Sequence, residues 1–244
     1  TFGALPAKTY GDADFTLSAV SNSTLSVSYS SSNTSVATVT GNTVHIVGAG
    51  STIITASQPG NTLWNAAPDV PQTLVVGKAD QTITFNALTT KTYGDADFAL
   101  TGVSSSALSV SYISSDPAVA TVTGNTVHIT GAGTTSITAS QAGDTNYNPA
   151  TDVPQTLTVN KADQTITFGP LLDQTFGVPD YTLFGTASSG LAVSYTSSNN
   201  GVATVTGSSV HIVAVGTTTI TASQTGDANY NAATSVPQTL NVFT

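Results

Sequence analysis

The sequence predicts an all-β fold, a tandem array of three immunoglobulin-like β-sandwiches arranged end to end. Two observations carry this prediction: one pattern recurs every 83 residues, and apolar residues alternate with polar ones among many β-branched side chains. A third observation is negative, since no stretch of ten or more residues shows the apolar stripe of an amphipathic helix. We therefore expect half-buried strands and no helices.

The repeat sets the domain boundaries. The block that starts at Val36 recurs at Val119 and Val202, and His45, His128 and His211 keep the same spacing of 83 residues. We expect three domains, at residues 1–77, 78–160 and 161–244, called repeats 1, 2 and 3 below. The first strand of repeat 1 is truncated, because no residues equivalent to Gln81, Thr82 and Ile83 precede Thr1.

Within one repeat the alternation predicts seven short strands separated by turns. Gly124 and Asn125 suit the tight turn of a hairpin, and Gly131 and Gly133 are free to adopt positive φ. Seven strands are enough for two packed sheets about 10 Å apart. In repeat 2 the expected strands are residues 81–85, 98–103, 108–113, 118–123, 126–130, 134–139 and 154–159.

Composition excludes several function classes. Only 7% of the residues are charged and the net charge is −9, whereas nucleic-acid binding needs a basic surface. No apolar run approaches the roughly 20 residues that span a bilayer. Cysteine is absent, which excludes disulfides and thiolate catalysis.

Two segments carry a resemblance to a known family. Residues 112–122 read YISSDPAVATV and residues 131–139 read GAGTTSITA, and they resemble the bacterial immunoglobulin-like domains of surface adhesins, the Big type. The run KADQTI at 78–83, with YGD at 93–95, is similar to the related MBG modules of large secreted bacterial proteins. The resemblance covers nearly the whole chain. In repeat 3, DQTFGV at 173–178 departs from the pattern.

The resemblance implies a non-catalytic spacer or stalk segment of a bacterial cell-surface adhesin or extracellular fibre. An enzyme is not expected from the residues either: there is one histidine per repeat, no G-x-S-x-G nucleophile motif and no glutamate. In each repeat the Val-His-Ile alternation places the histidine on the solvent face, opposite the apolar pair. The alternative function is a ligand-binding module for a glycan or a host protein.

Aspartates offer weak candidate calcium sites. Asp12 and Asp14, like Asp95 and Asp97, are two residues apart, so both carboxylates of an extended segment project to one side. Asp80 and Asp163 lie at the joints between repeats, where extracellular arrays hold calcium. Solvated loop carboxylates are the competing interpretation for all six, and no other cofactor is expected.

Aromatic residues also follow the repeat. Tyr29, Tyr112 and Tyr195 occupy one strand position, and Trp64, Tyr147 and Tyr230 occupy another. We expect both sets to anchor the core or a corner, with Trp64 the candidate ligand-binding exception.

The expected partners are neighbouring immunoglobulin-like repeats of the same or a longer polypeptide. The short joints favour an elongated chain, and the truncated first strand leaves an open sheet edge that invites strand addition. We expect the parent polypeptide to continue beyond both ends of the chain. Self-assembly of subunits into a filament by strand addition is the competing interpretation, although the chain shows no spare Gln-Thr-Ile segment to donate.

Overall fold

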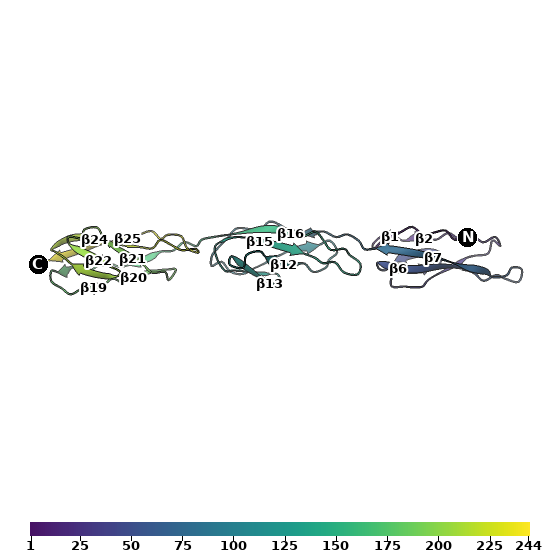
Figure 1. The fold of residues 1–244 in the computed structure, drawn as a ribbon, viewed down its shortest axis with the longest axis horizontal. Coiled ribbons are helices and arrows are strands. Elements are labelled where there is room, and N and C mark those ends of the chain that lie inside the picture. Colours follow the sequence, from purple (N-terminus) through teal and green to yellow (C-terminus); the bar gives the residue numbers. More distant parts are fainter. The chain divides into compact units, whose positions relative to one another are not determined.

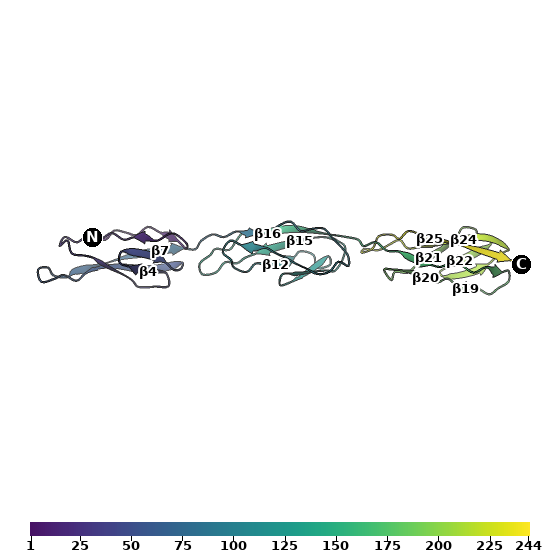
Figure 2. The ribbon, with the colours of Figure 1, turned by 180° about the vertical axis from the view of Figure 1, so that it is seen from behind.

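The computed structural model describes all 244 residues, and every regular element in it is a β-strand (Figure 1). There is accordingly no helix long and apolar enough to cross a membrane. The strands form three successive sandwiches, so the predicted immunoglobulin-like fold class is confirmed. Figure 2 shows the same strands from the opposite side.

Repeat 1 contains a four-stranded sheet, ordered β1-β7-β6-β3, and a three-stranded sheet, ordered β2-β5-β4. The hairpin of β6 and β7 is the longest in the repeat, with a register shift between Ala56 and Gln58. The strands are β1 (Lys8–Thr9), β2 (Phe15–Thr16), β3 (Ser28–Ser31), β4 (Ala37–Thr40), β5 (Thr43–Ile46), β6 (Gly50–Gln58) and β7 (Ala67–Gly77).

Repeats 2 and 3 keep both sheets and add a two-stranded one. In repeat 2 the sheets are ordered β12-β15-β16-β9, β10-β14-β13 and β11-β8, and in repeat 3 they are β18-β25-β24-β21, β19-β23-β22 and β17-β20. The strands of repeat 2 are β8 (Ile83–Thr84), β9 (Lys91–Thr92), β10 (Phe98–Ala99), β11 (Val103–Ser104), β12 (Ser111–Ser114), β13 (Ala120–Thr123), β14 (Thr126–Ile129), β15 (Gly133–Ser140) and β16 (Val153–Asn160). Those of repeat 3 are β17 (Ile166–Phe168), β18 (Gln174–Thr175), β19 (Tyr181–Thr182), β20 (Gly185–Ala187), β21 (Ser194–Ser197), β22 (Ala203–Thr206), β23 (Ser209–Ile212), β24 (Gly216–Ser223) and β25 (Val236–Phe243).

All seven strands expected in repeat 2 have a counterpart, but two further strands do not follow from the alternation. The segment expected at 98–103 is split into β10 and β11, and β9 was not expected. β9 pairs in parallel with the last strand of its repeat, Lys91 opposite Val159 and Thr92 opposite Asn160. Two residues are too short to show a period of two, and parallel pairing over a long sequence separation leaves no local signal.

Alternation places one face of each long strand in the core. Ile54 on β6 and Leu74 on β7 are fully buried, as is Val44 on β5 of the other sheet. Repeat 3 buries the equivalent Ile220, Leu240 and Val210. Burial of each such side chain contributes about 1.5–3 kcal/mol. The core of a repeat therefore lies between its two sheets, and the polar faces look outward.

The chain divides into two compact units, and the division passes through repeat 2. Unit 1 comprises Thr1–Asn86, Thr101–Tyr112 and Thr138–Pro154; unit 2 comprises Ala87–Leu100, Ile113–Ile137 and Gln155–Thr244. Repeat 1 and the part of repeat 2 that contacts it fall in unit 1, and repeat 3 and the part of repeat 2 that contacts it fall in unit 2. Each joint between repeats is thus described within a single unit.

Replacing Leu74 by alanine tests the core assignment. Because Leu74 is fully buried, Leu74→Ala should lower the free energy of unfolding of repeat 1 by about 2–5 kcal/mol. Trp64, the only tryptophan, makes the fluorescence of a denaturant titration specific for repeat 1. Val75, next in sequence and 52% exposed, provides the matched control, and Val75→Ala should change stability by less than about 0.5 kcal/mol. Equal losses in both variants would contradict the assigned faces.

Repeat 3 has a buried hydroxyl group that repeats 1 and 2 lack. Tyr181 stands where repeats 1 and 2 have Phe15 and Phe98, and its hydroxyl is buried with no hydrogen-bond partner. Burial also raises the pKa of the Tyr181 phenol. In repeats 1 and 2 a lysine ammonium lies 4.8 Å from the phenylalanine ring centroid, but repeat 3 has Gln174 at the lysine position.

We predict that Tyr181→Phe stabilises repeat 3 by about 1 kcal/mol, because it removes an unsatisfied polar group from the interior. This gain in stability should grow as the pH rises above about 10. The Tyr181 phenol then loses its proton more readily in the unfolded chain than in the folded one, which destabilises the parent but not the phenylalanine variant. Tyr195 is the matched control: its hydroxyl accepts a hydrogen bond from the Gly185 backbone N–H, so Tyr195→Phe should destabilise instead. Calorimetry of the parent and the two variants measures both changes in stability. A loss of stability in Tyr181→Phe would contradict the assignment of the Tyr181 hydroxyl as buried and unsatisfied.

Candidate functional site

The joint between repeats 1 and 2 is built around two tyrosine rings. Tyr147, in the loop that precedes β16, meets Tyr10 of repeat 1 edge to face, with 5.4 Å between centroids and 84° between planes. The equivalent pair, Tyr93 and Tyr230, joins repeats 2 and 3 at 5.5 Å and 85°. The same side chains therefore form both joints, and each pair lies inside one unit.

An asparagine one residue earlier adds a hydrogen bond to each joint. The Asn146 side-chain oxygen accepts from the Ala49 backbone N–H at 2.9 Å, and Asn229 accepts from Ala132 at 2.9 Å. The close approach of Asn146 to the backbone of repeat 1 requires glycine at position 48. A Cβ there would lie 2.7 Å from the Ser35 carbonyl oxygen and 3.3 Å from the Asn146 side-chain oxygen. The asparagine and the glycine thus fit together as a pair.

The segment that links two repeats is tied to the same loop. The Ala79 N–H donates to the Asn146 carbonyl at 2.9 Å, and the Asn148 N–H donates to the Ala79 carbonyl at 2.8 Å. The Lys78 ammonium donates to the Asp144 carbonyl. Ala162 and Lys161 make the equivalent bonds in repeat 3. The linking residues form a short parallel bridge beside Tyr147 or Tyr230 and are not a free tether.

The six candidate calcium aspartates are spread over separate roles. Asp12 and Asp95 each accept from a backbone N–H three residues earlier, at Thr9 and Thr92, both at 2.9 Å. Asp80 and Asp163 each accept from an asparagine side chain at 2.8 Å, Asn148 and Asn231 respectively.

The remaining two, Asp14 and Asp97, pair with histidines. No group of three or more His, Cys, Asp or Glu side chains comes together in the chain. Calcium at these six positions stays a prediction.

The histidines are exposed, as the alternation predicts, but each has an aspartate partner that the sequence analysis did not assign. His45 Nδ1 lies 2.7 Å from Asp14 Oδ1, and His128–Asp97 and His211–Asp180 share this distance. Asp14 and His45 lie opposite each other because Phe15 on β2 pairs with Val44 on β5. The available signal was the constant spacing of 31 residues between aspartate and histidine. Exposed pairs of this kind contribute little to stability.

The two aromatic positions differ in location. Tyr29, Tyr112 and Tyr195 are half-buried and pack against Phe2, Phe85 and Phe168 at 5.3–5.6 Å between centroids. Trp64 does not occupy a core position, since 48% of it is exposed and the neighbouring Leu63 is 85% exposed. Leu63 and Trp64 lie in a turn in which the Asn61 side-chain oxygen accepts hydrogen bonds from both of their backbone N–H groups. Trp64 is the equivalent of the joint residue Tyr147, and this accounts for its surface location.

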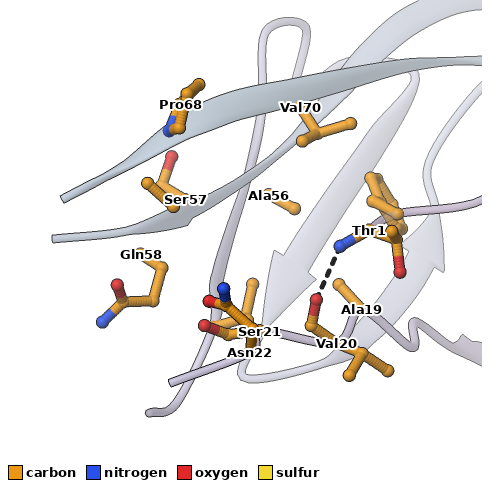
Figure 3. Close-up of a pocket in the computed structure, with 13 residues that line it drawn as sticks. Thr1, Ala19, Val20, Ser21, Asn22, Ala56, Ser57, Gln58, Pro68 and Val70 are labelled. Atoms are coloured by element: carbon orange, nitrogen blue, oxygen red, sulfur yellow. Dashed lines mark hydrogen bonds between the residues drawn. The ribbon is translucent and has the colours of Figure 1, made fainter. Parts of the chain in front are cut away.

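Repeat 1 also contains an open groove of about 570 Å³ (Figure 3). Apolar side chains of Phe2, Ala19, Val27, Ala56 and Val70 line it, together with polar residues that include Ser21, Asn22, Ser57 and Gln58. The Thr1 ammonium donates to the Val20 carbonyl at 2.6 Å at one side, drawn as a dashed line in Figure 3. The truncated first strand predicts an open sheet edge in this repeat, but it does not predict which residues line the groove.

Repeats 2 and 3 place a glutamine in the equivalent region. Gln164 is 6% exposed; its side-chain nitrogen donates to the Gln224 side chain and to the Asn231 carbonyl, both at 2.7 Å. Its side-chain oxygen accepts from the Ser189 hydroxyl. Gln81 makes the same three bonds in repeat 2, to Gln141, Asn148 and Ser106.

Comparison with known proteins gives structural similarities alone. No family model matches the chain, and no curated protein matches it. Among solved structures, it is similar to Drosophila N-cadherin EC1-3 at 12% identity, covering 98% of both chains with a TM-score of 0.38. Sidekick-1 immunoglobulin domains 1–5 match at 13% identity, over 100% of this chain and 58% of that one, with a TM-score of 0.37. Surface layer protein SbsC, domains 1–6, matches at 18% identity, over 100% and 40%, with a TM-score of 0.29.

Proposed function

We propose that the chain is a non-catalytic structural segment, a spacer or stalk of a bacterial cell-surface adhesin or extracellular fibre. The observation that carries this proposal is the repetition of the joint. Both joints use the same tyrosine pair, the same asparagine-to-backbone bond and the same lysine-to-carbonyl bond. A segment whose role is to set a distance needs neighbouring modules held in a defined relation, and repeated joints provide it.

Surface chemistry and motifs support the same proposal. The chain has few charges and many exposed serine and threonine side chains, which suit solubility without a specialised binding face. The KADQTI and GAGTTSITA runs support assignment to the Big or MBG type of module and, with it, an extracellular or surface location. We propose module boundaries at 77/78 and 160/161, where the linking lysines begin the next repeat.

Weakening one joint tests this proposal. The double variant Asn146→Ala, Tyr147→Ala removes the ring contact and the hydrogen bond to repeat 1 without touching the core. Because the chain has no cysteine, Thr40→Cys and Thr101→Cys introduce two unique spin-label sites, one in each repeat and both exposed in unit 1. Double electron–electron resonance should give a narrow distance distribution in the parent and a clearly broader one in the double variant.

His128→Ala, which alters an exposed residue of repeat 2 away from the joint, is the control and should leave the distribution narrow. A parent distribution as broad as that of the double variant would show that the joint does not hold the repeats, and would remove the basis of the spacer proposal.

A second candidate function, ligand binding, is favoured by the exposure of Trp64 and Leu63. Repeat 2 has Asn146 and Tyr147 at these positions, so the turn of repeat 1 is the more apolar one. If the turn binds a glycan or a host protein, Trp64→Ala should lower the signal on an array at least tenfold, while Tyr230→Ala should not change it. An array without any Trp64-dependent signal would leave the spacer as the single function.

A further inference from the structure

We propose that this chain carries the two halves of a second, apolar kind of joint, through which one copy of the three-repeat chain packs head to tail on another copy. One half is the turn of repeat 1 that contains Leu63 and Trp64, called the repeat 1 turn below. The other half is formed by Phe176, Ala214 and Val215, called the repeat 3 end face below. This contact rests on the role proposed above for the joints, and it adds a partner for two surfaces that the internal joints do not use.

The repeat 1 turn keeps the backbone of the internal joints but not their side chains. The Asn61 side-chain oxygen accepts from the N–H groups of Leu63 and Trp64 at 2.8 and 3.0 Å, and the Asp144 side-chain oxygen closes the equivalent turn of repeat 2 in the same way. Leu63 and Trp64 therefore take the places of the asparagine and the tyrosine that form both internal joints. The amide that bonds to a neighbouring repeat is replaced by an exposed aliphatic side chain.

The repeat 3 end face likewise keeps the backbone and changes the side chains. Phe176 stands in the place of Tyr93, and both N–H groups donate at 2.8 Å to the last strand of their own repeat. Ala214 stands in the place of Gly131, and both N–H groups donate at 3.2 Å to the equivalent valine carbonyl. Val215 follows in the place of an alanine and is 48% exposed, while Phe176 is 56% exposed. The face is therefore more apolar than those of the internal joints.

Ala214 excludes the asparagine-containing turns of repeats 2 and 3. A Cβ added at Gly131 would lie 3.3 Å from the Asn229 side-chain oxygen, which accepts from the Ala132 N–H at 2.9 Å. Ala214 supplies this methyl group in repeat 3, so an asparagine placed against it would have to move away and its amide would lose the hydrogen bond. Leucine has no such bond to lose, and it can pack against the methyl group at van der Waals distance.

The substitutions on the two halves match each other. Asparagine becomes leucine where glycine becomes alanine, and the tyrosine pair becomes Trp64 and Phe176, which keeps two aromatic rings and removes both hydroxyls. Burial of these exposed apolar side chains is the main favourable contribution to such a contact. The turns of repeats 2 and 3 are occupied by the internal joints, so within this chain the repeat 1 turn of another copy is the one that fits the face. These properties belong to the residues present, whatever precedes Thr1 or follows Thr244.

A tandem of two copies tests this contact. The copies are joined through Lys-Ala-Asp-Gln-Thr-Ile, copied from residues 78–83, with its lysine at the position of Thr244. Repeat 3 of the first copy is then followed by repeat 1 of the second. Thr206→Cys in the first copy and Ser18→Cys in the second provide exposed spin-label sites equivalent to the pair used for the internal joint. We expect double electron–electron resonance to give a distance distribution as narrow as that of the internal joint.

Exchanging the contact residues tests whether the two halves are matched. Leu63→Asn with Trp64→Tyr in the second copy places an internal-type turn against the apolar face, and the distribution should become clearly broader because Ala214 excludes the asparagine. Adding Phe176→Tyr, Ala214→Gly and Val215→Ala in the first copy should make it narrow again, since both halves are then of the internal kind. The linking residues are identical in all three proteins, so a difference in width comes from the contact alone.

Fluorescence of Trp64 provides a second readout. With Trp64→Phe in the first copy, the remaining tryptophan lies in the proposed contact, and its emission should shift to shorter wavelength relative to the single chain. An unshifted emission, a broad distribution in the unmodified tandem, or equal widths in the matched and mixed variants would each overturn the proposal. A narrow internal joint together with a broad tandem would leave the spacer proposal standing, so the two proposals fail separately.

Discussion

The buried glutamine at the start of a repeat is the interaction on which the rest of the arrangement depends. Gln81 and Gln164 are enclosed, and an amide that is buried without partners would cost several kcal/mol. Each amide is satisfied by a glutamine side chain and an asparagine carbonyl from the loop before the last strand of its repeat, and by a serine hydroxyl from a second segment. The glutamine thus holds the first strand in register, and the register of that strand determines where the preceding linking residues run.

The joint follows from this register. Ala79 precedes Gln81 by two residues, so the position of Gln81 places Ala79 against the loop that contains Asn146 and Tyr147. The same loop contacts repeat 1, at Ala49 and Tyr10. One loop therefore contacts both the linking segment and the neighbouring repeat. This coupling fixes the spacing between Lys78 and Gln81, because an inserted residue between them would displace either the amide or the bridge.

Much of the fold could be predicted from the sequence, but much less of the site. Long strands such as β15 and β16 show their period of two, and the exact repeat allowed three sandwiches to be assigned. β9 and β11 could not be predicted, since two residues carry no period. Tyr147 was expected in a core or corner because burial of an aromatic ring within a repeat and burial against a neighbour leave the same sequence pattern. The aspartate–histidine pairs depend on strand register, which the constant spacing signals only once the pairing is known.

The parallel pairing of β1 with β7 has a mechanical meaning. β1 lies near the beginning of repeat 1 and β7 ends it, with Lys8 opposite Val76 and Thr9 opposite Gly77. Because the two strands run in the same direction, a tension applied between the ends of the repeat pulls them past each other along their length. The hydrogen bonds between them are then loaded simultaneously in shear, whereas an antiparallel terminal pair pulled from its open end would unzip one bond at a time. The same pairing recurs in the other two repeats, so each repeat carries its own shear clamp against load.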